Sequence, residues 1–245
     1  MTRGATGGGA VKYDTTEWDM RSSHGLVVHL VGTQKDVLDV GCATGGLLGH
    51  LVGLGNRGVG LEGDPAQARV AASKGLEVLE WDLERGLPPL EGRSFDAVVF
   101  ADVLEHLKDP APVLRQARAR LAPGGRVIVS VPNIAHCSTR GRLLIGRFEY
   151  GEYGIMDRTH LRFFTKASVT RLLEECGFRV DRVVPVPAVP APPGLERLAL
   201  GRAWVRSATW RKLEDFAADL LPGLFADQFV VEARPQAPGL SAAPH

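Results

Sequence analysis

The chain has few cysteines, and their placement excludes two kinds of small protein. Among its 245 residues there are three, Cys42, Cys137 and Cys176, which are far apart and form no Cys-x-x-Cys pair. Such a set builds neither a disulfide framework nor a zinc knuckle. The 29 basic residues nearly balance the 28 acidic ones. This balance disfavours a general nucleic-acid binder.

Long apolar runs are also missing. No uninterrupted stretch approaches the roughly 20 apolar residues that a membrane-spanning helix needs, so we expect no membrane partner. The segment 1–10 is rich in glycine and lacks an apolar core, which a secretory signal peptide would have. The sequence therefore predicts a cytoplasmic protein, and 44% hydrophobic residues over this length suit one large α/β domain.

Residues 37–46 are the most informative stretch of the chain. They read Val-Leu-Asp-Val-Gly-Cys-Ala-Thr-Gly-Gly, so an apolar run containing Asp39 passes into small residues, and a helix-like run follows. This pattern predicts a buried strand that turns sharply into a helix. A turn without large side chains lets the backbone approach a ligand closely, with its N–H groups directed at it. A nucleotide-like ligand is the expectation.

Strand-like and helix-like segments alternate through most of the chain, which predicts a mainly parallel sheet with helices on both faces. The ends, 1–12 and 234–245, are rich in Gly, Pro, Ala and Ser and are expected to be disordered, which leaves a single domain over 13–233. The expected strands are 36–40, 58–62, 77–82, 96–101, 126–131, 178–186 and 225–233, and the expected helices are 46–54, 65–74, 102–107, 110–121 and 166–176.

Two stretches interrupt this alternation, residues 133–165 and 187–222, and the second contains a helix-like run. They follow the fifth and sixth expected strands. Ligands of open α/β sheets bind outside the carboxyl ends of the strands. We therefore expect both insertions to cap the site of a second ligand, although a surface decoration fits the second insertion equally well.

Acidic residues at strand ends narrow the choice of ligand. Glu62 ends the second strand, where a carboxylate can accept from both hydroxyls of a ribose. Asp82 ends the third strand and could accept from the exocyclic amine of adenine while Leu83 packs on the base, although such an Asp is more often a cap. The dinucleotide pattern G-x-G-x-x-G is broken by Ala43, and Asp39 would repel a pyrophosphate. Cationic S-adenosylmethionine (SAM) fits better.

Four stretches carry a resemblance to a known family. They read Val-Leu-Asp-Val-Gly-Cys-Ala-Thr-Gly, Gly-Leu-Glu-Gly-Asp-Pro, Phe-Asp-Ala-Val-Val-Phe-Ala-Asp-Val-Leu-Glu-His-Leu and Leu-Ala-Pro-Gly-Gly-Arg-Val-Ile-Val-Ser-Val-Pro-Asn. In order and spacing they resemble the successive motifs of class I SAM-dependent methyltransferases, over residues 35–185. Residues 148–165 resemble the MetW-like branch, a methyltransferase-domain-23 type that is often linked to surface-glycan or secondary-metabolite pathways.

The resemblance implies a Rossmann-like, seven-stranded sheet whose last strand is antiparallel, with a helical insertion before it. It also implies that SAM is the cofactor and S-adenosylhomocysteine the product. A leading helix with Tyr13, Trp18 and His24 would form a lid over SAM. Ala43 departs from the usual Gly of the turn, and we expect binding to survive this change. The expected cofactor contacts are Asp39, Gly41, Ala43, Gly45, Glu62, Asp82, Leu83, Ala101 and Asp102.

Methyl transfer to an oxygen requires the loss of a proton, and histidine is the usual base near neutral pH. His160 is the favoured catalytic residue, because Asp157 could orient its ring if the intervening turn is helical. His106, which follows the fourth strand, is next. For His136 a structural role fits better than a catalytic one.

A metal-assisted reaction is the less favoured mechanism. The set Asp102, Glu105, His106 and His160 resembles the metal-binding residues of the small-RNA 2′-O-methyltransferases, with Asp102 in place of the usual Glu. Two carboxylates and two imidazoles could hold a divalent ion that chelates a vicinal diol and lowers the pKa of a hydroxyl.

The acceptor is expected to be a small molecule, methylated on an oxygen of a sugar or secondary metabolite. Six arginines between residues 138 and 171 could bind phosphates of a nucleotide-linked acceptor, although a solvated basic face explains most of them. Two other classes stay open: a SAM-binding regulatory partner without transfer activity, and a nucleotide-dependent oxidoreductase. The sequence predicts no oligomeric state.

Overall fold

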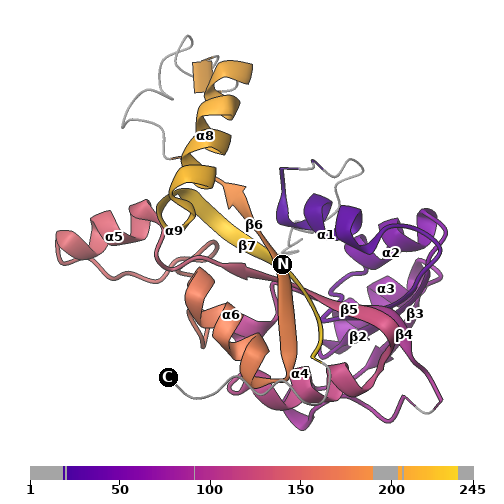
Figure 1. Ribbon diagram of the computed structural model, residues 1–245. Helices are drawn as coiled ribbons and strands as arrows, with labels where there is room; N and C mark the ends of the chain where they lie inside the picture. Colours follow the sequence, from indigo (N-terminus) through magenta and orange to yellow (C-terminus); the bar gives the residue numbers. More distant parts are fainter. Residues whose placement is uncertain (1–18, 20, 91, 190–203, 206, 237–245) are drawn as a thin grey trace, which may run out of the picture.

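The computed structural model describes residues 19, 21–90, 92–189, 204–205 and 207–236. Its centre is a seven-stranded sheet with the order β3-β2-β1-β4-β5-β7-β6 (Figure 1). Strands β1 to β5 pair in parallel, and β7 lies antiparallel between β5 and β6. The predicted Rossmann-like sheet with an antiparallel last strand is confirmed. The strands are β1 (Asp36–Val40), β2 (Arg57–Glu62), β3 (Glu77–Glu80), β4 (Phe95–Ala101), β5 (Leu121–Pro132), β6 (Phe178–Pro187) and β7 (Ala226–Pro235).

Helices cover both faces of the sheet, as predicted. On one face α1 (Ser23–Val31) and α2 (Gly46–Gly53) share an apolar core with β1, β4, β5 and β7. On the other face α4 (Pro110–Ala119) and α6 (Lys166–Glu175) build the larger core. The strands between these two layers are buried on both sides, which explains why they read as continuous apolar runs.

Capping residues fix where several helices begin. Asp64 accepts a hydrogen bond from the N–H of Ala66 at the start of α3 (Pro65–Ser73). Thr165 forms a reciprocal capping box with Ser168 at the start of α6. Caps of this kind contribute about 1 kcal/mol each to stability. The sequence therefore located these helix starts from local signals alone.

Glycines bring α2 close to β2. A Cβ atom on Gly60 would lie 2.5 Å from Sγ of Cys42, and one on Gly58 would lie 2.5 Å from a methyl of Leu48. At these two positions β2 has no side chain, so its backbone packs directly against the turn and against α2. A side chain at Gly60 would press on the turn at Cys42, and one at Gly58 would press on Leu48 and Val52 of α2.

One predicted helix is wrong. Residues 102–107 form no α-helix but a single 3₁₀ turn, η2 (Leu104–His106). The reason is Asp102, whose φ of 56° lies in the left-handed region, so this residue cannot itself belong to a right-handed helix, and the helical turn begins only at Leu104. Strand β3 ends at Glu80, before the predicted Asp82. Strand β7 continues to Pro235, two residues into the segment expected to be disordered.

The two insertions contain short helices. The first, 133–165, holds α5 (Cys137–Leu144), and the second, 187–222, holds α8 (Ala208–Leu220), while α9 (Pro222–Phe225) begins at its last residue. Arg21, just before α1, forms ion pairs with Glu214 and Asp215 of α8. The expected disorder of 1–12 and of 237–245, the positions of Tyr13 and Trp18, and residues 190–203 of the second insertion lie outside the described residues. Within the described part, no helix is long and apolar enough to cross a membrane.

Candidate active site

The turn after β1 forms a cavity of about 100 Å³ at the carboxyl ends of β1 and β4, which we call the turn cavity. Five residues predicted to contact the cofactor line it together, and Gly45 lies between two lining segments. The turn cavity is thus where the topology of an open parallel sheet places a ligand. Its lining residues are His24, Asp39, Gly41, Cys42, Ala43, Gly46, Leu47, Ala101 and Asp102.

Asp39 is the most constrained charge in the turn cavity. Its side chain is buried, and its Oδ2 atom has no hydrogen-bond partner among the described residues. Burial, reinforced by the nearby carboxylate of Glu62, raises the pKa of Asp39 to about 7. A buried carboxylate without a donor is costly in its ionised form. A cation in the cavity would remove this cost, whereas a phosphate would increase it.

Glu62 fixes the shape of the turn through both of its oxygens. Oε2 accepts from the backbone N–H of Ala43 at 2.8 Å, and Oε1 accepts from that of Asp64 at 2.8 Å. Each carboxylate oxygen has a further lone pair that is able to accept from a ligand hydroxyl. Ala43 itself adopts a left-handed conformation with φ 49°. Ala43 thus replaces the usual glycine of the turn but keeps the positive φ that glycine favours.

Gly41 and Gly45 hold the turn in place for steric reasons. Both have positive φ, 75° and 76°, and a Cβ on either would lie within 2.7 Å of a side-chain atom of Val103 or Leu76. Only glycine combines this backbone conformation with this packing.

Asp82 and Leu83 stand apart from the turn cavity. Asp82 follows β3 and caps the 3₁₀ turn η1 (Leu83–Arg85), where its Oδ1 accepts from the N–H of Glu84 at 3.0 Å. The cap role that the sequence suggested as an alternative is thus present. A contact of Asp82 and Leu83 with adenine stays a prediction.

Asp102 is held by hydrogen bonds from two other strands, which the sequence motifs did not predict. Its Oδ1 atom accepts from the hydroxyl of Ser130 at 2.8 Å and from the side-chain amide of Gln228 at 3.1 Å. Ser130 lies on β5 and Gln228 on β7, so three strands converge on one carboxylate. One signal was present in the sequence: an antiparallel last strand begins at the edge where parallel strands end. The polar residues Asp227 and Gln228 at its start therefore belong to the site.

A second and larger cavity of about 450 Å³ adjoins the first, and we call it the histidine cavity. His24 and Asp102 line both cavities. The first insertion contributes six residues between Tyr153 and His160 to the histidine cavity, whose lining combines polar and apolar surface. The full lining is Ser23, His24, Asp102, Glu105, His106, Pro132, Tyr153, Gly154, Ile155, Asp157, Thr159, His160, Asp227 and Gln228.

His160 and His106 meet in the histidine cavity, with ring centroids 4.9 Å apart. The Nδ1 atom of His160 lies 3.1 Å from the carbonyl oxygen of Ile155 and must donate to it, which leaves Nε2 as the acceptor in the neutral ring. Burial is the main cause that lowers the pKa of His160. Asp157 acts on the turn instead, where its Oδ1 accepts from the N–H and hydroxyl of Thr159.

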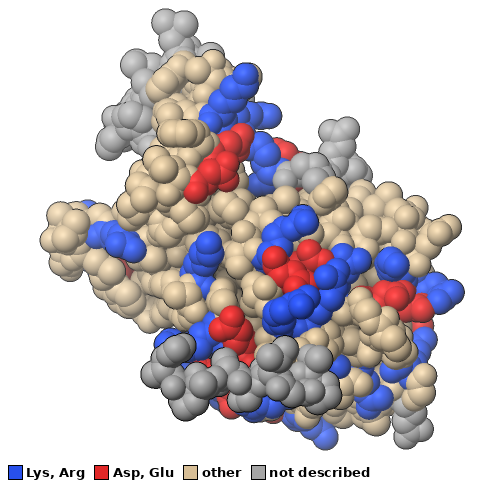
Figure 2. Space-filling model, in the orientation of Figure 1, with Lys and Arg blue, Asp and Glu red and all other residues tan. Residues whose placement is uncertain are grey.

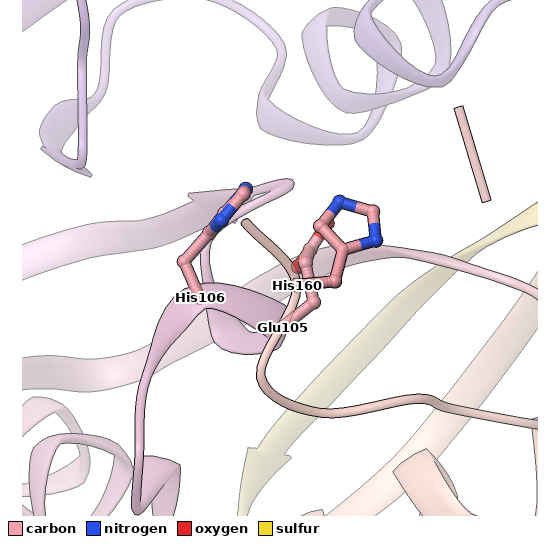
Figure 3. Close-up of side chains that lie close together, drawn as sticks. All are labelled: Glu105, His106 and His160. Atoms are coloured by element: carbon pink, nitrogen blue, oxygen red, sulfur yellow. The ribbon is translucent and has the colours of Figure 1, made fainter. Parts of the chain in front are cut away.

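Glu105 lies beside the two histidines (Figure 3). Its side chain is only 1% exposed, and neither carboxylate oxygen has a hydrogen-bond partner among the described residues. Burial raises the pKa of Glu105 well above its ordinary value. One ligand atom from each of Glu105, His106 and His160 lies within 4.8 Å of the others. Asp102, the fourth member of the expected metal set, is outside this cluster because Ser130 and Gln228 hold it.

His136 has a structural role. It caps α5, with Nδ1 2.8 Å from the hydroxyl of Ser138 and Nε2 2.7 Å from the carbonyl of Ala188. Both ring nitrogens are thus engaged, and the ring links the two insertions. The structural interpretation of His136 fits these contacts.

The fold is a Rossmann-like α/β sheet, and two adjoining cavities, the turn cavity and the histidine cavity, lie at the carboxyl ends of its strands. Residues 26–183 match the sequence profile described as a methyltransferase domain. The chain belongs to this methyltransferase-domain family. This agrees with the resemblance seen in the sequence motifs.

Individual proteins of known sequence resemble only part of this chain, and at low identity. A probable S-adenosylmethionine-dependent methyltransferase of Mycolicibacterium smegmatis is 31% identical over 60% of this chain and 53% of its own length. A ubiquinone biosynthesis O-methyltransferase of Dinoroseobacter shibae is 32% identical over 60% and 61%. A bifunctional MetXA/MetW protein of Rhodopirellula baltica is 27% identical over 64% and 27%. The chain thus spans about half the length of the curated relatives it matches.

Solved structures share the fold. A SAM-dependent methyltransferase from Archaeoglobus fulgidus superposes with a TM-score of 0.57 at 19% identity, covering 87% of this chain and 95% of that one. A TehB-like methyltransferase from Corynebacterium glutamicum gives a TM-score of 0.54 at 14% identity, with 87% of each chain covered.

The left-handed backbone of Ala43 predicts an unusual substitution effect. Ala43→Gly should raise the free energy of unfolding by about 0.5–1 kcal/mol, because glycine adopts φ 49° without the strain that a Cβ imposes. The matched control is Ala72→Gly, the same chemical change on the exposed face of α3, which should lower stability by up to about 1 kcal/mol. Urea unfolding of both variants measures the difference. Equal destabilisation by both changes would contradict the strained turn.

Proposed function

We propose that this protein transfers a methyl group from SAM to an oxygen of a small hydroxylated molecule. The observation that carries the proposal is the common wall of the two cavities, formed by His24 and Asp102. The two cavities meet at these shared residues, so a methyl donor bound in the turn cavity and an acceptor bound in the histidine cavity would contact each other there. Methyl transfer is an in-line displacement and needs such contact between two positioned reactants.

The turn cavity supports SAM as the donor. Its size suits the methionine part of the cofactor, and the partnerless carboxylate of Asp39 suits the positive charge of that part. The ribose would then lie at Glu62, whose two oxygens are fixed by the turn. The adenine would lie toward Asp82 and Leu83. A pyrophosphate would bring negative charge next to Asp39, so a dinucleotide fits less well.

The histidine cavity supports a neutral, hydroxyl-rich acceptor. Its volume falls within the range usual for small-molecule sites. Asp102, Asp157 and Asp227 line it, and none of its lining residues is an arginine. A phosphate would meet like charge in this cavity. The sugar or secondary metabolite expected from the sequence is compatible with the lining, and a nucleotide-linked acceptor would have to keep its phosphates outside the cavity.

His160 is the base in this proposal. Because Nδ1 donates to Ile155, the free Nε2 atom can take a proton from the acceptor hydroxyl. A base must be neutral to act. Burial lowers the pKa of His160, so the neutral ring persists at pH values below 6.5. His106 is the second candidate, with its Nδ1 atom 3.2 Å from the carbonyl of Thr159.

Replacing His160 tests this role. His160→Gln should lower kcat by about 10²–10⁴-fold, the contribution typical of a general base, while the affinity for SAM stays unchanged. For the unaltered protein, kcat should fall only as the pH drops below about 6.5, because the pKa of His160 is lowered. The measurement is transfer of labelled methyl from SAM to a panel of sugars and phenols, followed by mass spectrometry.

The control is His106→Gln, a matched change on the neighbouring ring. A large loss with His106→Gln and none with His160→Gln would move the role of base to His106. If no acceptor of the panel is methylated while SAM binds, the regulatory alternative, a SAM-binding protein without transfer activity, gains support.

A metal-assisted reaction is the second candidate, and the orphaned carboxylate of Glu105 is the observation that favours it. Glu105, His106 and His160 would hold a divalent ion, and this donor set of one carboxylate and two imidazoles fits such ions. The ion would lower the pKa of a bound hydroxyl. We place this mechanism second because Asp102, the fourth member of the expected metal set, is held by Ser130 and Gln228 and lies outside the cluster.

Chelation separates the two mechanisms. Under the histidine-base mechanism, turnover should be unchanged after dialysis against EDTA. A loss of turnover that Mg²⁺ or Mn²⁺ restores would contradict that mechanism. In that case Glu105→Gln should abolish both the restoration and the metal content measured by elemental mass spectrometry, because an amide replaces a charged ligand.

A further inference from the structure

The segment of the first insertion that holds α5 extends away from the rest of the molecule (Figure 1). We call residues 137–150 the arm. Every residue from 140 to 150 is exposed. Its apolar side chains are therefore in contact with water. It is unusual for so many exposed apolar side chains to lie close together in one segment. Their exposed fractions are Leu143 48%, Leu144 87%, Ile145 67%, Phe148 51% and Tyr150 52%.

The arm is basic as well as apolar. Arg140, Arg142 and Arg147 lie among these apolar residues, and Glu149 is the single acidic residue between 137 and 150. In Figure 2 the lobe at the place of α5 is mostly tan and blue. Two such arms from separate copies would bring like charges together. An anionic lipid surface complements both properties, because it takes up apolar side chains and attracts arginines.

Aromatic rings connect the arm to the histidine cavity. The ring centroids of Phe148 and Tyr150 are 5.6 Å apart, and Tyr150 is 6.5 Å from Phe163. Phe163 is in turn 6.4 Å from His160. The exposed apolar surface therefore continues to the residue that we favour as the base. A surface covering the arm would lie next to the mouth of that cavity.

We propose that the arm docks the protein on anionic lipid bilayers, with Leu144, Ile145 and Phe148 in the interface and the arginines at the headgroups. This proposal departs from the expectation of no membrane partner, which rested on the lack of a membrane-spanning run and does not bear on peripheral binding. If the proposed function holds, docking would favour acceptors that carry an apolar chain and reside in the bilayer. The docking itself is measured without turnover, so its failure and the failure of the proposed function are distinguishable.

The test is flotation of the full chain with vesicles of phosphatidylcholine and phosphatidylglycerol in equal parts, against vesicles of phosphatidylcholine alone. We expect binding to the anionic vesicles at least tenfold tighter than to the neutral ones, and a decrease of that binding between 0.1 and 0.5 M salt. Equal binding to both vesicle types, or binding to neither, overturns the proposal.

Variants locate the contact on the arm. Leu144→Asp with Ile145→Asp should weaken binding to anionic vesicles at least tenfold, and Arg142→Glu with Arg147→Glu should do the same. All four side chains are exposed, so a thermal melt is expected to show an intact fold. The matched control is Leu220→Asp, at a position 64% exposed on α8.

Two outcomes contradict the arm as the docking surface. One is an equal loss of vesicle binding with Leu220→Asp, which would make the binding unspecific. The other is a dimer in light scattering that Leu144→Asp with Ile145→Asp dissociates, combined with no vesicle binding. That result would make a second copy of the chain the occupant.

Discussion

The site is organised around the buried carboxylate of Asp39, whose Oδ2 atom has no hydrogen-bond donor among the described residues. Asp39 ends up in this position because β1 is an interior strand between β2 and β4, covered by α1 and α2 on the face to which Asp39 points. Keeping the group ionised at neutral pH costs on the order of 4 kcal/mol, from a pKa raised from 3.8 to about 7. The fold therefore carries a cost that a cationic ligand would relieve, which is typical of binding sites.

The rest of the site follows from how strands end around this carboxylate. Glu62, one strand away, fixes the turn by its hydrogen bond to Ala43. Asp102, at the end of the neighbouring β4, turns into the left-handed region and is held by β5 and β7. The carbonyl of Glu105 in η2 then accepts from the backbone N–H groups of Leu161 and Arg162, at 2.7 and 2.9 Å, and these hydrogen bonds hold the first insertion where His160 meets His106.

The sequence predicted the sheet well because its signals are local. Caps such as Asp64 and Thr165, and the small residues of the turn, act within a few positions of themselves. The long-range parts of the site were less accessible. No local pattern tells that Gln228 reaches Asp102, because only the antiparallel insertion of β7 beside β5 brings them together. Likewise, the carbonyl of Ile155 orients His160, and backbone groups carry no sequence signature.

The most direct test of the account is calorimetric titration of the protein with SAM at pH 6 and pH 8, with NADH in parallel. Because a cation needs Asp39 ionised, and because its pKa is near 7 in the free protein, SAM should bind about tenfold more tightly at pH 8 than at pH 6. Asp39→Asn should bind SAM more weakly and without this pH dependence. Micromolar binding of NADH with no binding of SAM, or an Asp39→Asn variant that keeps the full affinity and pH dependence, would contradict the account.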